Sequence, residues 1–262
     1  MKFWLRSLAV AALLAPPALA KADVFDAQTP SDDTTATENE LIHRTEQVHD
    51  LAAKGGVVDA DWYRISAKGY SSYEVVIDQT SANVTPIVVQ RYASDGTTLL
   101  DTSVALSTIG ASRTLRWENT NSTASTQFVK ITSGSCTTTC NTTAVYRIRA
   151  FDTTYMIPRF YNNGPDVSSV VLQNPTNGTV TYHAELWSDG GIHLDTHTVI
   201  LPPRSLDLWT ISGSAVANKT GSVTVTATAG YGELFGKITQ MELVSLGGVV
   251  NEAWDHPMLP KP

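Results

Sequence analysis

Two aspartates at the start of a strand-like segment are the residues of this chain best placed to do chemistry. Asp59 and Asp61 lie in GVVDADWYRIS (56–66), and an alternating, aromatic stretch follows them at once. In an extended chain, residues two apart point to the same side, so the two carboxylates can share one calcium ion, which takes six to eight oxygen ligands. The alternative is a turn at the strand entrance, in which each aspartate caps a backbone N–H.

A second candidate site lies in TYHAELWSDGGIHLDTH (181–197), which is expected to form a hairpin around its Asp-Gly-Gly turn. Pairing Leu186 with Ile192 and Ala184 with Leu194 keeps the apolar residues on one face. The other face then carries three histidines and two carboxylates, namely His183, Glu185, His193, Asp195 and His197. Such a set suits zinc or copper, or acid–base hydrolysis. The alternative is a solvated sheet face with ordinary cross-strand pairs.

Aromatic residues are a third candidate feature, because sugar rings can stack on exposed aromatic side chains. The candidates are Trp62, Tyr63, Tyr70, Tyr73, Tyr92, Trp117, Trp187 and Trp209. Strand alternation must bury about half of them in the core, so the sequence permits carbohydrate binding without specifying it. No Gly-x-Ser-x-Gly, His-Glu-x-x-His or Ser-x-x-Lys pattern of a common hydrolase occurs.

The two cysteines, Cys136 and Cys140, lie close together in GSCTTTCNTT (134–143). Their spacing is one residue longer than the redox motif Cys-x-x-Cys, and a zinc site would need a second pair of ligands. A disulfide that closes a short loop suits an oxidising compartment. We therefore expect these cysteines to be bonded to each other and to hold a loop tip.

The first 22 residues have the three parts of a secretory signal peptide. Lys2 and Arg6 supply the positive start, residues 8–14 are apolar, and small residues surround a cleavage point near Ala20. The apolar run is too short for a membrane span, and no later segment is long enough. We therefore expect a secreted, periplasmic or cell-surface protein.

Net charge narrows the classes of partner. Cleavage after Ala20 leaves 16 basic and 25 acidic residues, a formal charge of −9. A chain this acidic is poorly suited to nucleic acid or to anionic membrane surfaces.

Short alternating segments separated by turn residues predict an all-β fold. Between residues 61 and 151 they are WYRISAK, SYEVVIDQ, PIVVQRYA, RTLRWEN, TQFVKIT and VYRIRAF, and a second run begins near Tyr155. Regular spacing of this kind is typical of antiparallel β-sandwiches. In the last segment of the first run, alternation predicts that Tyr146, Ile148 and Ala150 share one face.

The first run resembles the bacterial pre-peptidase C-terminal (PPC) domain family. The resemblance rests on DADWYRI (59–65), VVQRYASDGTTLL (88–100), LRWEN (115–119) and YRIRA (146–150), and it covers about residues 41–151. It implies a jelly-roll-like β-sandwich that accompanies secreted bacterial enzymes and is not itself catalytic. It also favours extended structure for residues 40–51, where the sequence alone leaves helix and strand open.

The resemblance also bears on calcium. Some collagen-binding relatives hold calcium with acidic residues from the arm and from the first strand. This implies a site in the present chain made of Glu38, Asn39, Glu40, Asp59 and Asp61.

The second run resembles an accessory β-sandwich module of secreted bacterial proteins, a module without a settled activity. The matching segments include IPRFYNNGPDVSSVVLQNPTNGTVTYHAELWSDGG (157–191) and LPPRSLDLWTISG (201–213). We expect a signal peptide at 1–22, a flexible arm at 23–40, a PPC-like sandwich at 41–151 and a second sandwich at 152–262.

The function expected from these features is that of a secreted, non-catalytic binding or surface-associated protein. Its partner would be a polysaccharide or an extracellular protein surface. One alternative is a structural component of an extracellular assembly, joined through sheet edges or the arm. Another is a hydrolase that works with the histidine face of the hairpin.

Overall fold

Alternation of apolar and polar side chains organises the described part of the chain into strands alone. The computed structural model describes residues 24–27, 29–52, 59–79, 87–103, 112–134, 140, 143–243 and 250–261. The predicted all-β fold of antiparallel sheets is confirmed. Within those ranges no helix is long and apolar enough to cross a membrane. The predicted signal peptide and Cys136 lie outside the described residues, so the signal peptide and the Cys136–Cys140 disulfide stay predictions.

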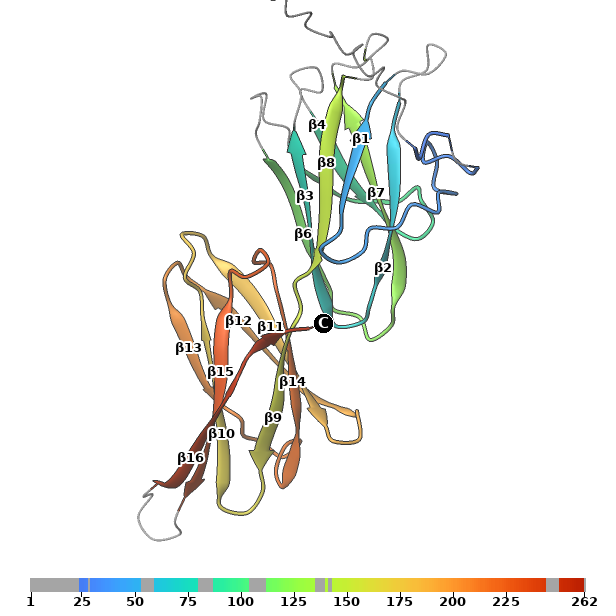
Figure 1. Ribbon diagram of the computed structural model, residues 1–262. Coiled ribbons are helices and arrows are strands. Elements are labelled where there is room, and N and C mark those ends of the chain that lie inside the picture. The colour runs from blue at the N-terminus through green and yellow to red at the C-terminus, as the bar shows by residue number, and fades with distance from the viewer. Residues whose placement is uncertain are drawn as a thin grey trace, which may run out of the picture.

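The first domain contains eight strands in two antiparallel sheets (Figure 1). The strands are β1 (Glu46–Asp50), β2 (Asp61–Ala67), β3 (Ser71–Gln79), β4 (Ile87–Tyr92), β5 (Leu99–Ser103), β6 (Ser112–Asn119), β7 (Ser125–Ser133) and β8 (Val145–Asp152). One sheet has the order β1-β8-β3-β6, and the other has the order β2-β7-β4-β5.

The second domain contains nine strands, again in two antiparallel sheets. They are β9 (Tyr155–Asn162), β10 (Asp166–Gln173), β11 (Val180–Ser188), β12 (His193–Leu201), β13 (Leu206–Thr210), β14 (Lys219–Ala227), β15 (Phe235–Leu243), β16 (Val250–Pro257) and β17 (Leu259–Pro260). The sheet orders are β13-β10-β15-β16 and β12-β11-β14-β9-β17.

Each domain has its own apolar core between its two sheets. Tyr63, Ile131 and Ile148 are fully buried in the first core, and Ile157 and Val223 are fully buried in the second. The predicted alternation in β8 is confirmed, because its residues 146, 148 and 150 all lie in the first core. The two cores share no residue, so each sandwich has a hydrophobic centre of its own.

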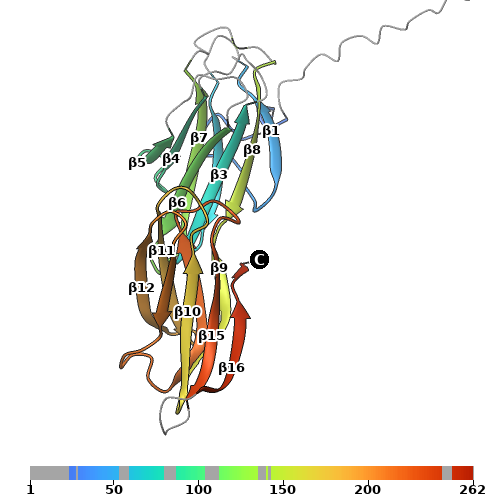
Figure 2. The same cartoon turned by 90° about the vertical axis from the view of Figure 1, so that its left-hand side faces the viewer.

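The two sandwiches follow one another end to end, as Figures 1 and 2 show. Only Thr153 and Thr154 separate β8 from β9, and both are buried. The C-terminal segment returns to this point, because β17 pairs with β9 and the backbone N–H of Lys261 donates to the carbonyl of Thr154 at 2.8 Å. The short, buried connection leaves little freedom for one domain to swing on the other.

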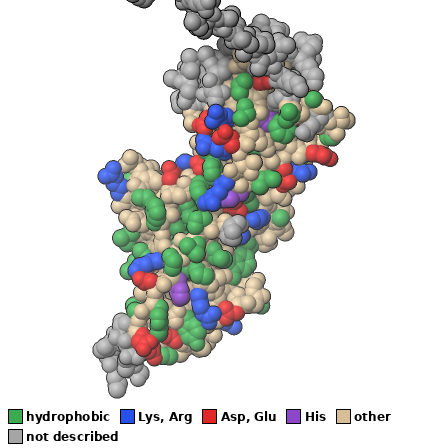
Figure 3. Space-filling view, viewed as in Figure 1, with side chains coloured by type: hydrophobic (Ala, Val, Ile, Leu, Met, Phe, Trp, Pro, Cys, Tyr) green, Lys and Arg blue, Asp and Glu red, His purple; other side chains and the backbone are tan. Residues whose placement is uncertain are grey.

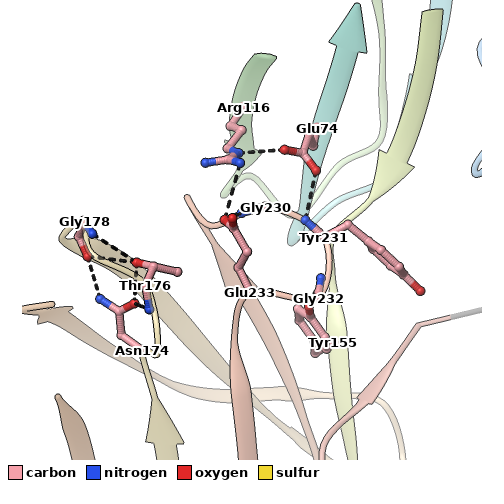
Figure 4. A network of polar contacts seen from close by, with 10 residues as sticks. All are labelled: Glu74, Arg116, Tyr155, Asn174, Thr176, Gly178, Gly230, Tyr231, Gly232 and Glu233. Atoms are coloured by element: carbon pink, nitrogen blue, oxygen red, sulfur yellow. Dashed lines mark hydrogen bonds and ion pairs between the residues drawn. The ribbon is translucent and has the colours of Figure 1, made fainter. Parts of the chain in front are cut away.

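A polar network on one side of the joint fixes the two domains to each other (Figure 4). The buried carboxylate of Glu74, on β3, accepts hydrogen bonds from Arg116 Nε at 2.8 Å and from the backbone N–H of Tyr231 at 2.9 Å. Arg116 also lies 3.4 Å from Glu233 in the second domain. The guanidinium of Arg44 lies over the Tyr231 ring, 4.9 Å from its centroid.

Other contacts hold the joint at the ends of β3 and β6. The backbone N–H of Ala227 donates to Ser72 Oγ at 3.3 Å. His183 Nδ1 lies 3.1 Å from a carboxylate oxygen of Glu118. Burial raises the pKa of Glu118, and the neighbouring His183 opposes that shift. In the second domain these contacts reach β14 and β11, whereas the Glu74 network reaches the segment before β15, so together they resist rotation as well as separation.

We predict that Glu74→Ala loosens the joint while leaving both cores intact. The change removes a buried acceptor from two donors, and hydrogen bonds to charged groups contribute about 1.5–3 kcal/mol each. In differential scanning calorimetry, the single transition of the wild type should broaden or split into two.

The matched control is Glu46→Ala. Glu46 lies on β1, at the edge of the same sheet, and its exposed carboxylate is 3.5 Å from Arg147. An exposed pair of this kind contributes about 1 kcal/mol or less. Equal effects of the two substitutions would contradict the role given to Glu74.

Candidate functional site

The arm folds back onto the first strand and brings carboxylates there that the sequence analysis did not select. The backbone N–H of Trp62 donates to the carbonyl of Asp32 at 2.7 Å, and the Phe25 ring stacks on His49 with centroids 4.5 Å apart. These contacts draw the acidic segment around Asp33 over the start of β2. That segment reads as a linker in the sequence because it has no periodicity.

Asp59 and Asp61 both lie at this place but belong to two different groups. Asp59 lies with Asp26 and Asp33, and Asp61 lies with Asp32 and His49. In each group, one ligand atom per residue lies within 4.8 Å of the others, which is close enough to hold a single ion. The spacing of the two aspartates predicts that they bind one shared ion. In the structure they belong to two separate groups instead.

Two of the three arm residues expected to complete the site belong to neither group. Glu38 is exposed, and Glu40 lies 3.5 Å from Arg64 in a surface ion pair. Asn39 is buried, and its backbone carbonyl accepts from the N–H of Arg64 at 2.8 Å, so its part in the site stays a prediction. The arm carboxylates that lie beside Asp59 and Asp61 are those of Asp26, Asp32 and Asp33.

The ionisation of Asp59 is disfavoured by its surroundings. Burial raises the pKa of Asp59 to about 8, and the nearby carboxylates of Asp26 and Asp33 add to this shift. Without a cation, Asp59 therefore holds a proton at neutral pH. An all-oxygen set of three carboxylates is the ligand type that calcium prefers.

The Asp61 group is fully enclosed and has a different chemistry. Asp61 accepts a hydrogen bond from the hydroxyl of Tyr146, whose pKa is raised well above its ordinary value by burial and by that carboxylate. His49 Nδ1 lies 3.4 Å from the carboxylate of Asp32, which is 1% exposed and whose two carboxylate oxygens accept no hydrogen bond from any described residue. With an imidazole in the set, this group suits calcium less well than the Asp59 group does.

The predicted register of the second-domain hairpin is wrong. β11 and β12 pair Tyr182 with Val199 and Trp187 with His193, with a bulge between Leu186 and Trp187. The hairpin loop runs from residue 189 to 192, so the pairing is displaced by two to three residues from the expected one.

This register separates the five polar residues expected to share one face. Glu185 still contacts His193, with 2.6 Å between Oε2 and Nε2, but His183 turns to Glu118 of the first domain. Asp195 is exposed and caps the N–H of the next residue. His197 lies beside Ala184 on the other face and stacks on Trp209 at 4.1 Å. Among the described residues these five side chains have no common focus for a metal ion.

A cleft of about 540 Å³ lies on the side of the joint where the hairpin meets the first domain. The first domain contributes the turn at Gly69 and Tyr70 and the loop at Ser122, and the second contributes the Trp187–Asp189 segment, part of β14 and Lys261. Burial lowers the pKa of Lys261. The volume lies within the range of about 300–1,000 Å³ that is usual for ligand clefts.

Tyr70 carries an unusual backbone conformation at the rim of this cleft. Its φ is 46°, in the left-handed region that bulky residues avoid. Such a conformation costs about 1–3 kcal/mol and persists where its surroundings fix it. Here the N–H of Tyr70 donates to the carbonyl of Asn121 at 3.0 Å, and Gly69 lies so near Ser122 that a Cβ would be 2.4 Å from its carbonyl oxygen.

The Tyr70 ring reaches across the joint to the hairpin. It stacks on His193, with centroids 5.1 Å apart and planes 16° apart, and it meets Trp187 edge-on at 5.1 Å. Of the eight aromatic residues singled out in the sequence, only Tyr70 and Trp187 line the cleft, whereas Trp62, Tyr63, Tyr73 and Trp117 are buried.

Comparisons with known proteins find similar solved structures at low sequence identity. No family model matches the chain, and no curated protein matches it. The pre-peptidase C-terminal domain of a Bacillus anthracis collagenase is 10% identical, with a TM-score of 0.32, over 43% of this chain and 92% of that one. A secreted protein of Eubacterium rectale, described as putative, is 9% identical, with a TM-score of 0.34, over 90% of this chain and 84% of that one.

A Bacteroides uniformis β-glucuronidase 2 is 8% identical, with a TM-score of 0.22. The alignment spans 83% of this chain but only 32% of the glucuronidase. These are likenesses of strand arrangement.

The raised pKa of Asp59 predicts how stability depends on pH when no divalent cation is present. A folded-state pKa of about 8, against 3.8 for the free group, means that the protonated form stabilises the fold. This contribution is fully present below pH 4 and is lost as the pH rises through 8. In EDTA, the melting temperature of the first domain should therefore fall between pH 6 and pH 9.

The Asp59→Asn variant has a side chain of the same shape that cannot ionise. The melting temperature of this variant should therefore fall less over the same pH range. Parallel curves for the wild type and this variant would show that Asp59 does not titrate there.

Proposed function

We propose that this chain is an extracellular, non-catalytic binding protein that holds a polymer in the cleft between its two sandwiches. The observation that carries the proposal is the construction of the cleft from both domains across a fixed joint. Tyr70 from the first domain and Trp187 from the second line the same space. A site assembled in this way exists only in the two-domain protein and is pre-organised, which lowers the entropic cost of binding.

The arrangement of polar groups favours binding over hydrolysis. Glu185 is 3% exposed, and its Oε2 already lies 2.6 Å from both His193 and Thr196 Oγ1. One face of the His193 imidazole stacks on the Tyr70 ring, and the side chain is 33% exposed. A general acid or base must reach the proton that it transfers, and here the carboxylate is buried and already hydrogen-bonded to two partners.

We expect the chain that begins at Asp23 to bind its partner without turnover. This protein should migrate more slowly in native gels that contain a soluble polysaccharide, or bind an immobilised extracellular protein such as gelatin. The same samples should release no reducing ends and no peptides. Turnover that is lost in His193→Ala would contradict the proposal and support the hydrolase alternative.

Calcium binding by Asp26, Asp33 and Asp59 is a second part of the proposal. The ion would neutralise the buried carboxylates of Asp26 and Asp59 together with the exposed one of Asp33, and it would fix the arm to the first strand. Its support is the proximity of the three carboxylates and the raised pKa of Asp59, which burial causes and the neighbouring carboxylates increase. The ion would displace the proton on Asp59, so calcium affinity should increase with pH.

Thermal unfolding in EDTA and then in calcium tests this part. A ligand at one hundred times its Kd adds about 2.7 kcal/mol to the free energy of unfolding, so calcium should raise the melting temperature of the wild type. The rise should vanish in Asp59→Asn and remain in Asp195→Asn, which changes an exposed carboxylate of the second domain. An equal rise in both variants would refute the assignment.

A second candidate function is a part in an extracellular assembly, and one observation favours it. Leu206, Leu208 and Phe235 are 63%, 64% and 57% exposed on the sheet that contains β13, β10 and β15. Figure 3 shows hydrophobic side chains gathered over the second domain in this view. Large exposed apolar patches commonly mark interaction sites. Concentration-dependent association in sedimentation equilibrium, lost in Leu208→Asp, would support this candidate over a monomeric binding protein.

A further inference from the structure

We propose that the interdomain cleft is a glycan site that takes an uncharged pyranose ring against Tyr70. The proposal rests on the function proposed above and names the class of ligand for the same cleft. Four observations carry it: the conformation of Tyr70, the aromatic packing of its ring at the cleft wall, the polar groups around it, and the interdomain contacts that do not involve that ring.

The conformation of Tyr70 indicates that its ring is needed at this position. Glycine or asparagine would occupy the left-handed region with less strain, yet the chain has a tyrosine there with φ of 46°. Strained residues that the surrounding structure fixes occur preferentially at functional sites. The close approach of Gly69 to Ser122 supplies that fixation and sets the direction of the side chain.

The ring itself is prepared as a stacking surface. His193 covers one face of Tyr70, and Trp187 meets the ring edge-on. Tyr70 packs on no other described aromatic ring, and it is half-buried and lines the cleft. The apolar C–H face of a pyranose packs on an aromatic ring held in this way, because it buries apolar area without leaving polar groups unpaired.

The polar groups of the cleft suit the hydroxyls of a sugar better than a peptide. Ser122, Ser188, Ser222 and Thr224 supply small hydroxyl groups that both donate and accept. Asp189 and Lys261 add one negative and one positive charge on the cleft wall. Because these charges are balanced, the cleft has no excess of either sign, and a neutral ligand rich in hydroxyls complements it.

The joint has polar contacts besides the aromatic cluster. The Glu74–Arg116–Glu233 network and the Glu118–His183 pair join the domains without the Tyr70 ring. Replacing the ring therefore removes the stacking surface and two interdomain aromatic contacts, while these polar contacts remain. Asparagine is the replacement of choice because it accepts the same backbone conformation.

The test measures affinity of the full mature chain for soluble xyloglucan and galactomannan as neutral glycans, polygalacturonate as an acidic glycan, and gelatin as a protein. We expect binding to at least one neutral glycan. Tyr70→Asn should weaken it by roughly tenfold or more, as the loss of an aromatic contact and its buried area would do. The melting temperature should change little, because the relief of backbone strain offsets the loss of the two interdomain aromatic contacts.

Two matched variants complete the test. Tyr70→Phe keeps the ring and should keep most of the affinity. Tyr161→Asn removes a half-buried tyrosine of β9 that does not line the cleft, and it should leave glycan affinity unchanged.

The outcomes separate this inference from the proposed function. Neutral-glycan binding that Tyr70→Asn leaves intact would overturn the glycan assignment to this cleft and leave a binding protein. Binding to polygalacturonate or gelatin alone would overturn the ligand class in the same way. Failure to bind any of the four polymers would overturn the proposed function and this inference together.

Discussion

The carboxylate of Glu74 is the constraint on which the arrangement of this molecule depends. It is buried at the end of the first sandwich and accepts hydrogen bonds both from Arg116 of its own domain and from the backbone of Tyr231 in the other. A buried charge of this kind is tolerated only when it is paired and hydrogen-bonded. Both donors reach this carboxylate only when the domains are docked. The hydrogen bonding of a buried charge in the first sandwich therefore depends on the position of the second sandwich. The cleft follows from that fixed position.

The fold could be predicted from the sequence because local patterns of apolar and polar residues define each strand. Alternation of period two separates core from surface in strands such as β8, where Tyr146 and Ile148 face inward and Arg147 is exposed. Turn residues mark the strand ends. The hairpin register could not be read in this way, because apolar matching centred the turn on Asp189, whereas the chain turns one residue later, with Gly191 at φ 74°, and adds a bulge after Leu186. A displacement of this size was enough to move His197 to the other face.

The sites depend on contacts that a sequence pattern does not contain. The pair at Asp59 and Asp61 was recognisable, but its partners Asp26 and Asp32 come from an arm without periodicity. Only the folding back of that arm, through the stacking of aromatic side chains and a backbone hydrogen bond, places its carboxylates on the first strand. The cleft has the same origin, since Tyr70 and Trp187 are far apart in the sequence and meet only through the joint.

The account is tested most directly by a crystal structure of the mature chain with an oligosaccharide of a neutral glycan that it binds. We expect a pyranose ring packed on Tyr70 in the cleft, with hydroxyls within hydrogen-bond reach of the cleft side chains and the two sandwiches docked as here. A sugar bound away from the joint, or a Tyr70 backbone with negative φ and its ring turned out of the cleft, would contradict it.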